Sequence, residues 1–269
     1  MTNVTPINVD FVEAGSVGPV VMLVHSSVSG ARQWRRLMED LKDRFRVRAV
    51  NLFGYGKTPP WPAEATQSLD DQVRLVEAAL PAHNDEICLV GHSFGGSVAM
   101  KAAARLAGRV AKLVLLETNP FYLLAQCGSI DAFAEAMKLR NCVKKFGALG
   151  QWATAAEKFT DYWGGAGTWR EMTLERRAAF TEALKPNYFE WDAVMNDYHA
   201  LRSSSEHAAV EEMVLAQSLG DADRQAPRHE EGNRRPGTPA GRDHAPHLGR
   251  RHRVPLGPGG RGSMTTARA

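Results

Sequence analysis

The sequence predicts an α/β fold in which helices flank a mostly parallel sheet and a helical segment follows the first part of the sheet. Short apolar runs alternate with amphipathic stretches through the first 118 residues. Such alternation is typical of a parallel sheet with right-handed crossovers. The composition, 43% hydrophobic and 23% charged, excludes a wholly disordered or fibrous chain.

The predicted strands are short runs that are rich in apolar residues. They cover residues 19–25, 46–52, 86–90 and 111–116. The run at residues 19–25 is apolar throughout as far as Val24, which favours a strand that is covered on both faces, and the other runs look similar.

The stretches between these runs predict helices. In residues 31–43 the apolar side chains recur at three- and four-residue spacing, which places them on one helical face. Ser68 and Asp71 form a capping box at the start of the next helix. Residues 94–107 are rich in Ala and Gly, which suits a third helix packed closely on the sheet.

The strand signals stop at Asn119, and residues 119–201 predict a helical segment. The expected helices cover residues 132–137, 150–162, 174–184 and 192–201. Four of the six tryptophans of the chain lie in this segment, namely Trp152, Trp163, Trp169 and Trp191. Two interpretations stay open and are compatible: these rings form the core of a helical subdomain, and some of them line an apolar substrate pocket.

The motif that carries chemistry is Gly91-His-Ser-Phe-Gly95, a G-x-S-x-G sequence. It directly follows an apolar strand and directly precedes the Ala-rich helix. In this setting small residues at 91 and 95 allow a sharp turn that holds the Ser93 hydroxyl out of the sheet. The helix start behind Ser93 directs backbone N–H groups toward a developing oxyanion.

Four matches in order make residues 1–201 similar to the α/β-hydrolase family, in its cap-bearing branch. They are His25–Gly30 after a central strand, Asn51–Lys57 after the next, the Ser93 motif, and Leu113–Leu116 with Glu117–Pro120 behind it. The resemblance implies that residues 1–118 are the first part of the hydrolase core, 119–201 a helical cap and 202–224 a return to the core. It also implies that the nucleophile is Ser93 and that the backbone amides of Ser27 and Phe94 form the oxyanion hole.

The chain departs from the family at two of these positions. The family usually has His-Gly where this chain has His25-Ser26, and loss of that glycine narrows the allowed backbone. The family usually has Asp where this chain has Asn51, and we assign no catalytic role there. We interpret His25 and His92 as structural or cleft-lining residues.

The rest of a catalytic triad is expected after the helical segment. A serine hydroxyl needs a histidine to take its proton and a carboxylate to orient that histidine. The resemblance implies His244 as the base and Asp221, which follows a predicted strand at 213–216, as the acid. Asp223 and Glu117 remain alternative acids.

Residues 225–269 break the composition of the chain. They hold nine arginines against three acids, eight glycines and six prolines, which predicts an irregular tail that is disordered or non-native. The composition already changes after about Leu201, which is what a reading-frame change in a GC-rich gene would produce. The tail offers no last strand to hold His244, so we expect the hydrolytic activity of the protein to be impaired.

Nucleic-acid binding by this tail is not expected, because the tail lacks aromatic residues for base stacking.

Other classes of protein are disfavoured by what the sequence lacks. No apolar run approaches the roughly 18 residues of a membrane helix, and the first residues do not resemble a secretory signal. With only three cysteines, we expect a cytoplasmic protein with free thiols. No metal-binding motif and no glycine-rich nucleotide loop occurs, so we expect neither a metal nor a cofactor.

Two function classes follow from these observations. The first is a serine hydrolase of a small, mainly apolar ester or related acyl compound, with a carbon–carbon bond hydrolase as a sub-case that uses the same residues. The second is a catalytically inactive binding protein with the same fold. A small molecule is the expected partner in both classes.

Overall fold

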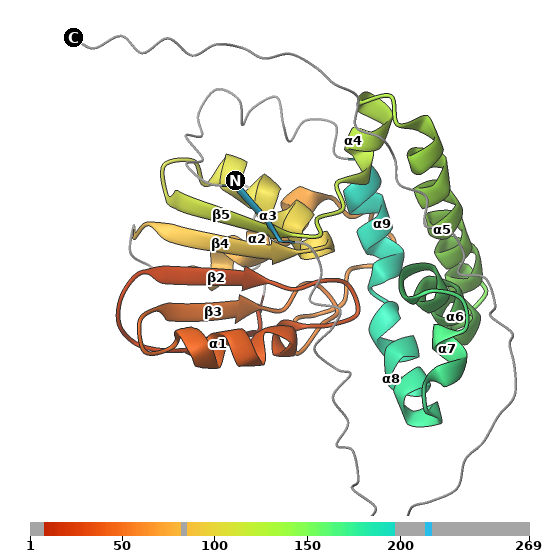
Figure 1. Cartoon of the computed structure of the whole chain (residues 1–269), viewed down its shortest axis with the longest axis horizontal. Coiled ribbons are helices and arrows are strands. Elements are labelled where there is room, and N and C mark those ends of the chain that lie inside the picture. The colour runs from red at the N-terminus through yellow and green to blue at the C-terminus, as the bar shows by residue number, and fades with distance from the viewer. Residues whose placement is uncertain (1–7, 82–84, 197–212, 217–269) are drawn as a thin grey trace, which may run out of the picture. The chain divides into compact units, whose positions relative to one another are not determined.

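The computed structural model describes residues 8–81, 85–196 and 213–216, and its centre is a six-stranded sheet (Figure 1). The strands are β1 (Phe11–Ala14), β2 (Val20–Val24), β3 (Arg46–Val50), β4 (Ile87–His92), β5 (Val110–Leu116) and β6 (Met213–Ala216). Their order across the sheet is β1-β3-β2-β4-β5-β6, and only the β1–β3 pair is antiparallel. The predicted parallel sheet is confirmed. The sequence analysis missed β1, a four-residue edge strand with no fully buried side chain.

The order of the strands reverses beside β2. From β2 the chain moves outward to β3, and it then returns to the opposite side of β2 as β4. In open parallel sheets ligands bind at the carboxyl ends of the strands where this reversal occurs. The residues that follow β2 and β4 therefore lie where a site is expected.

Both faces of the sheet are covered by helices. Val21 and Leu23 of β2 pack with Trp34 and Met38, which belong to the short 3-10 helix η1 (Ala31–Trp34) and to α1 (Arg35–Leu41). The alternate residues of β2 pack in a second cluster with α2 (Leu69–Ala79) and α3 (Phe94–Arg105). This two-sided burial explains why the β2 sequence is apolar throughout. The capping box predicted at Ser68 is present at the start of α2.

Six helices follow β5 within residues 121–196. They are α4 (Phe121–Gln126), α5 (Ile130–Ala148), α6 (Trp152–Gly164), α7 (Thr168–Glu171), α8 (Leu174–Leu184) and α9 (Asn187–Asn196). In Figure 1 they stand beside the end of the sheet to which the arrowheads of β2, β3 and β4 point. We call residues 121–196 the helical segment.

The helical segment differs from the four helices that the sequence predicts. α5 is longer than the predicted 132–137, α9 begins five residues earlier than predicted, and α4 and α7 were not predicted. The reason lies in tertiary packing. Buried residues of α4, α5 and α9 join the core cluster of the sheet, while α6, α7 and α8 bury a small cluster around Trp169 and Leu184.

Within the described ranges, no helix combines the length and the apolar character that a membrane crossing requires.

His25 ties the end of β2 to the loop that follows β3. Its ring is fully buried and lies edge-on to Tyr55 at 4.6 Å. The Nε2 atom accepts the backbone N–H of Leu52 at 3.1 Å, so Nδ1 carries the proton and donates it to the carbonyl of Ser26 at 2.8 Å. Burial lowers the pKa of His25 to about 4, and the ring is therefore neutral. The structural interpretation of His25 is confirmed.

The depressed pKa of His25 predicts a loss of stability in mild acid. In the unfolded chain the imidazole pKa is near 6.5, so the neutral ring makes its full contribution to the free energy of unfolding above that pH. As the pH falls toward about 4, protonation of the unfolded chain removes up to about 3 kcal/mol of this free energy. Urea unfolding of the wild type and of His25→Gln between pH 7 and pH 4 measures this effect. The difference in unfolding free energy between the two proteins should shrink as the pH falls, and a difference that is constant with pH would contradict the assignment.

Candidate active site

Ser93 lies at a sharp turn between β4 and α3. Its backbone has φ 53° and ψ −120°, a region that non-glycine residues rarely adopt. The close approach of α3 to the sheet at this turn requires glycine at positions 91 and 95. A Cβ atom at Gly95 would lie 2.3 Å from the carbonyl oxygen of His25, and one at Gly91 would lie 2.4 Å from the carbonyl oxygen of Gly95. The strand–turn–helix geometry predicted for this motif is therefore present.

Three non-glycine residues of the described chain have positive φ, and all three follow a strand at the carboxyl edge of the sheet. Val28 (φ 69°) follows β2, Ser93 (φ 53°) follows β4 and Glu117 (φ 44°) follows β5. Each such residue costs about 1–3 kcal/mol and persists only where its surroundings hold it. Val28 is the most unusual of the three, since a β-branched side chain disfavours this conformation. Strain is thus concentrated around the Ser93 turn.

Two backbone amides near Ser93 have no hydrogen-bond acceptor among the described residues. In the loop after β2, the N–H of Ser26 donates to Gln33 Oε1 at 3.0 Å and that of Val28 donates to the Tyr55 hydroxyl at 2.9 Å. The N–H of Ser27, which lies between them, has no hydrogen-bond acceptor among the described residues. Phe94 is the first residue of α3, and the first N–H groups of a helix lack an intrahelical acceptor. These are the two amides that the sequence analysis expects in an oxyanion hole.

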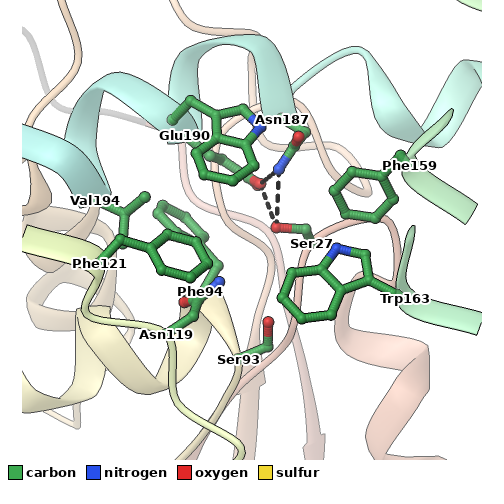
Figure 2. Close-up of a pocket in the computed structure, with 11 residues that line it drawn as sticks. Ser27, Ser93, Phe94, Asn119, Phe121, Phe159, Trp163, Asn187, Glu190 and Val194 are labelled. Atoms are coloured by element: carbon green, nitrogen blue, oxygen red, sulfur yellow. Dashed lines mark hydrogen bonds between the residues drawn. The ribbon is translucent and has the colours of Figure 1, made fainter. Parts of the chain in front are cut away.

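A small pocket lies over Ser93, with residues of the helical segment on its far side (Figure 2). Its free space is about 20 Å³, which is room for about one water molecule. Most of the lining is apolar, and it comes from Phe94 and from helical-segment residues that include Phe121, Phe159, Trp163, Trp191 and Val194. The aromatic residues divide between two places, because Trp169 lies in a buried cluster whereas Trp163, which is 52% exposed, lines this pocket.

The polar part of the pocket wall is centred on Glu190, which the sequence analysis missed. Its carboxyl group is 1% exposed and accepts hydrogen bonds from Ser27 Oγ at 2.5 Å, Asn187 Nδ2 at 2.9 Å and the Tyr55 hydroxyl at 2.9 Å. Burial is the largest influence on its pKa, which is raised above the ordinary value for glutamate. A signal did exist in the sequence, since Glu190 stands between the apolar residues Phe189 and Trp191.

His92 and Glu117 form a separate polar group on the other side of the turn. Gln33 Nε2 lies 2.9 Å from His92 Nδ1, and because an amide nitrogen can only donate, Nδ1 is the acceptor. The Nε2–H then faces Glu117 Oε2 at 3.6 Å. Burial lowers the pKa of His92, which keeps the ring neutral. These contacts are those of a structural histidine.

The structure places only some of the predicted site residues. Ser93, Ser27 and Phe94 line one pocket, whereas Glu117 lies beside His92. His244, Asp221 and Asp223 lie outside the described residues, as does the predicted tail at 225–269. Among the described residues no group of three or more His, Cys, Asp or Glu side chains is arranged to hold a metal ion.

Comparisons with curated proteins return a lipase and esterases together with a haloalkane dehalogenase and a cis-3-alkyl-4-alkyloxetan-2-one decarboxylase. Lipase LipV of Mycobacterium tuberculosis is 39% identical over 105 residues, which cover 38% of this chain and 39% of the lipase. A pimeloyl-[acyl-carrier protein] methyl ester esterase of Methylococcus capsulatus is 29% identical over 156 residues, which cover 55% of this chain and 59% of the esterase. The chain thus spans between about two fifths and three fifths of the length of these relatives.

A solved structure and a family model agree on the fold. The crystal structure of an alpha/beta hydrolase from Sphaerobacter thermophilus superposes with a TM-score of 0.52 at 21% identity, and the match covers 72% of this chain and 73% of that one. At this identity the likeness concerns the fold alone. The model of the alpha/beta hydrolase fold family matches residues 19–170, more than half of the chain. By fold, strand order and family match, this chain belongs to the alpha/beta hydrolase fold family.

Proposed function

We propose that this protein is a carboxylic ester hydrolase that acts on a small, mainly apolar acyl ester with Ser93 as the nucleophile. The observation that carries the proposal is the strained turn that presents Ser93 to a pocket beside two uncommitted amides. The named activities of the relatives, a lipase and a methyl ester esterase, support the same reaction class.

In the proposed reaction, Ser93 Oγ attacks the ester carbonyl carbon while His244 takes its proton. The carbonyl oxygen becomes an oxyanion, which accepts hydrogen bonds from the N–H groups of Ser27 and Phe94. Asp221 orients His244 and stabilises the imidazolium. His244 returns the proton to the leaving alcohol, and a water molecule activated by the same histidine then releases the acid from Ser93.

The helical segment is proposed to act as the cap of this site. Phe121, Phe159 and Trp163 form part of an apolar wall over Ser93, and the small free space favours short acyl chains. No cation faces the pocket among its lining residues, so recognition of the acyl group rests on shape and apolar contact.

Replacing Ser93 by Ala should abolish hydrolysis, with a loss of about 10³-fold or more in kcat for p-nitrophenyl acetate. The alanine variant should also resist labelling by a fluorophosphonate probe. Ser129→Ala is the matched control, because Ser129 is exposed and lies outside the pocket. Turnover by Ser93→Ala at the wild-type rate contradicts the proposal. Labelling of Ser93 without ester turnover favours the inactive binding protein.

The acid and the base are tested by substitution at each candidate. Asp221→Asn should lower kcat by about 10⁴-fold, because a histidine without its carboxylate adopts the wrong tautomer, and His244→Ala should do the same or more. Asp223→Asn and Glu117→Gln should stay within about tenfold of the wild type. A large loss in either of these two variants instead of Asp221→Asn would reassign the acid.

Enlarging the pocket should change the preferred chain length of the acyl group. Trp163→Ala removes a half-exposed ring from the pocket wall, and it should raise kcat/KM for a hexanoyl ester relative to an acetyl ester by about tenfold. Trp152→Ala is the matched control, since Trp152 also lies on α6 but packs against Tyr188 and does not line the pocket. Identical chain-length profiles for the three proteins would show that the helical segment does not shape the acyl site.

A further inference from the structure

We infer that Glu190 is a positioning residue that holds the Ser27 loop, so that helix α9 sets the geometry of the oxyanion hole. The catalytic consequence of this inference rests on the proposed function. The contacts between Glu190 and the Ser27 loop do not, because they are part of the fold. Ser27 and Glu190 are 163 residues apart, and they meet at the wall of the pocket (Figure 2).

The first attachment of the loop is the side chain of Ser27. Its hydroxyl donates to Glu190 Oε2 at 2.5 Å and accepts from Asn187 Nδ2 at 3.2 Å. The same Nδ2 atom donates to Glu190 Oε2 at 2.9 Å, so the three side chains form a closed triangle. Both partners of Ser27 come from the first turn of α9, and both are buried.

The second attachment is the residue that follows. The N–H of Val28 donates to the Tyr55 hydroxyl, which donates in turn to Glu190 Oε1. The Val28 side chain packs against the cluster that α6, α7 and α8 bury. Val28 therefore keeps its unusual positive φ through contacts with the helical segment and with Tyr55.

Between these two attachments, the N–H of Ser27 faces no described acceptor. Position 26 of this loop is a serine and not the glycine that the resemblance implies, and its backbone is held by side-chain hydrogen bonds on both sides of Ser27. Without Glu190, neither Ser27 Oγ nor the Tyr55 hydroxyl keeps its acceptor. A displacement of the Ser27 amide by about 1 Å is enough to cost about 100-fold in rate.

The test compares Glu190→Ala and Glu190→Gln with Asp192→Asn in the full chain. Asp192 lies on the same helix and ties α9 to α5 through Lys144 and Arg140, so its loss loosens α9 without touching Ser27. Glu190→Ala should lower kcat for p-nitrophenyl acetate by about 10- to 100-fold with KM within about threefold. Glu190→Gln keeps one carbonyl acceptor and should recover part of this loss, and Asp192→Asn should stay near the wild type.

A second readout does not depend on turnover. In ¹⁵N-labelled protein, the amides of Ser27 and Val28 should shift and exchange with D₂O faster in Glu190→Ala and in Tyr55→Phe than in Asp192→Asn. Unchanged shifts and exchange at both amides overturn the inference, whether or not the enzyme is active. An equal loss of kcat in Asp192→Asn and Glu190→Ala also overturns it, because the effect is then one of helix stability. Failure of the proposed function would show separately, as turnover that survives Ser93→Ala.

Discussion

The close approach of α3 to the carboxyl ends of β2 and β4 is the constraint on which the site depends. At Gly91 and Gly95 the helix and the sheet are too close to admit a side chain. Ser93, which lies between these glycines, has a strained backbone conformation. The same packing brings the first amides of α3 beside the loop after β2. Strand order reverses beside β2, and at this edge of the sheet Ser93, Ser27 and Phe94 line one pocket.

The loop after β2 is the part of the site that is held from outside the sheet. On the sheet side, His25 and Gln33 fix its start through hydrogen bonds to Ser26. On the other side, Glu190 of α9 and the Tyr55 hydroxyl fix Ser27 and Val28. The helical segment thus contributes to the site in two ways, since it forms the apolar wall over Ser93 and also supports the backbone beneath that wall.

Burial shifts the pKa of the titratable groups around the pocket toward the side that favours their neutral forms. It lowers the pKa of His25 and His92 and raises the pKa of Tyr55 and Glu190. In such a site the backbone N–H groups are the main source of positive potential.

Short-range patterns in the sequence determined the parallel strands, the capping box of α2 and the Ser93 turn, because each depends on residues that are neighbours along the chain. The existence of a helical segment was also predictable, but α4, α7 and the length of α5 were not, since packing on the sheet and between helices decides them. The sequence also indicated Ser27 and Phe94 as oxyanion donors by resemblance. Only the tertiary structure showed that Glu190, 163 residues from Ser27, supports that loop, because a buried hydrogen bond between distant segments leaves no periodic trace in the chain.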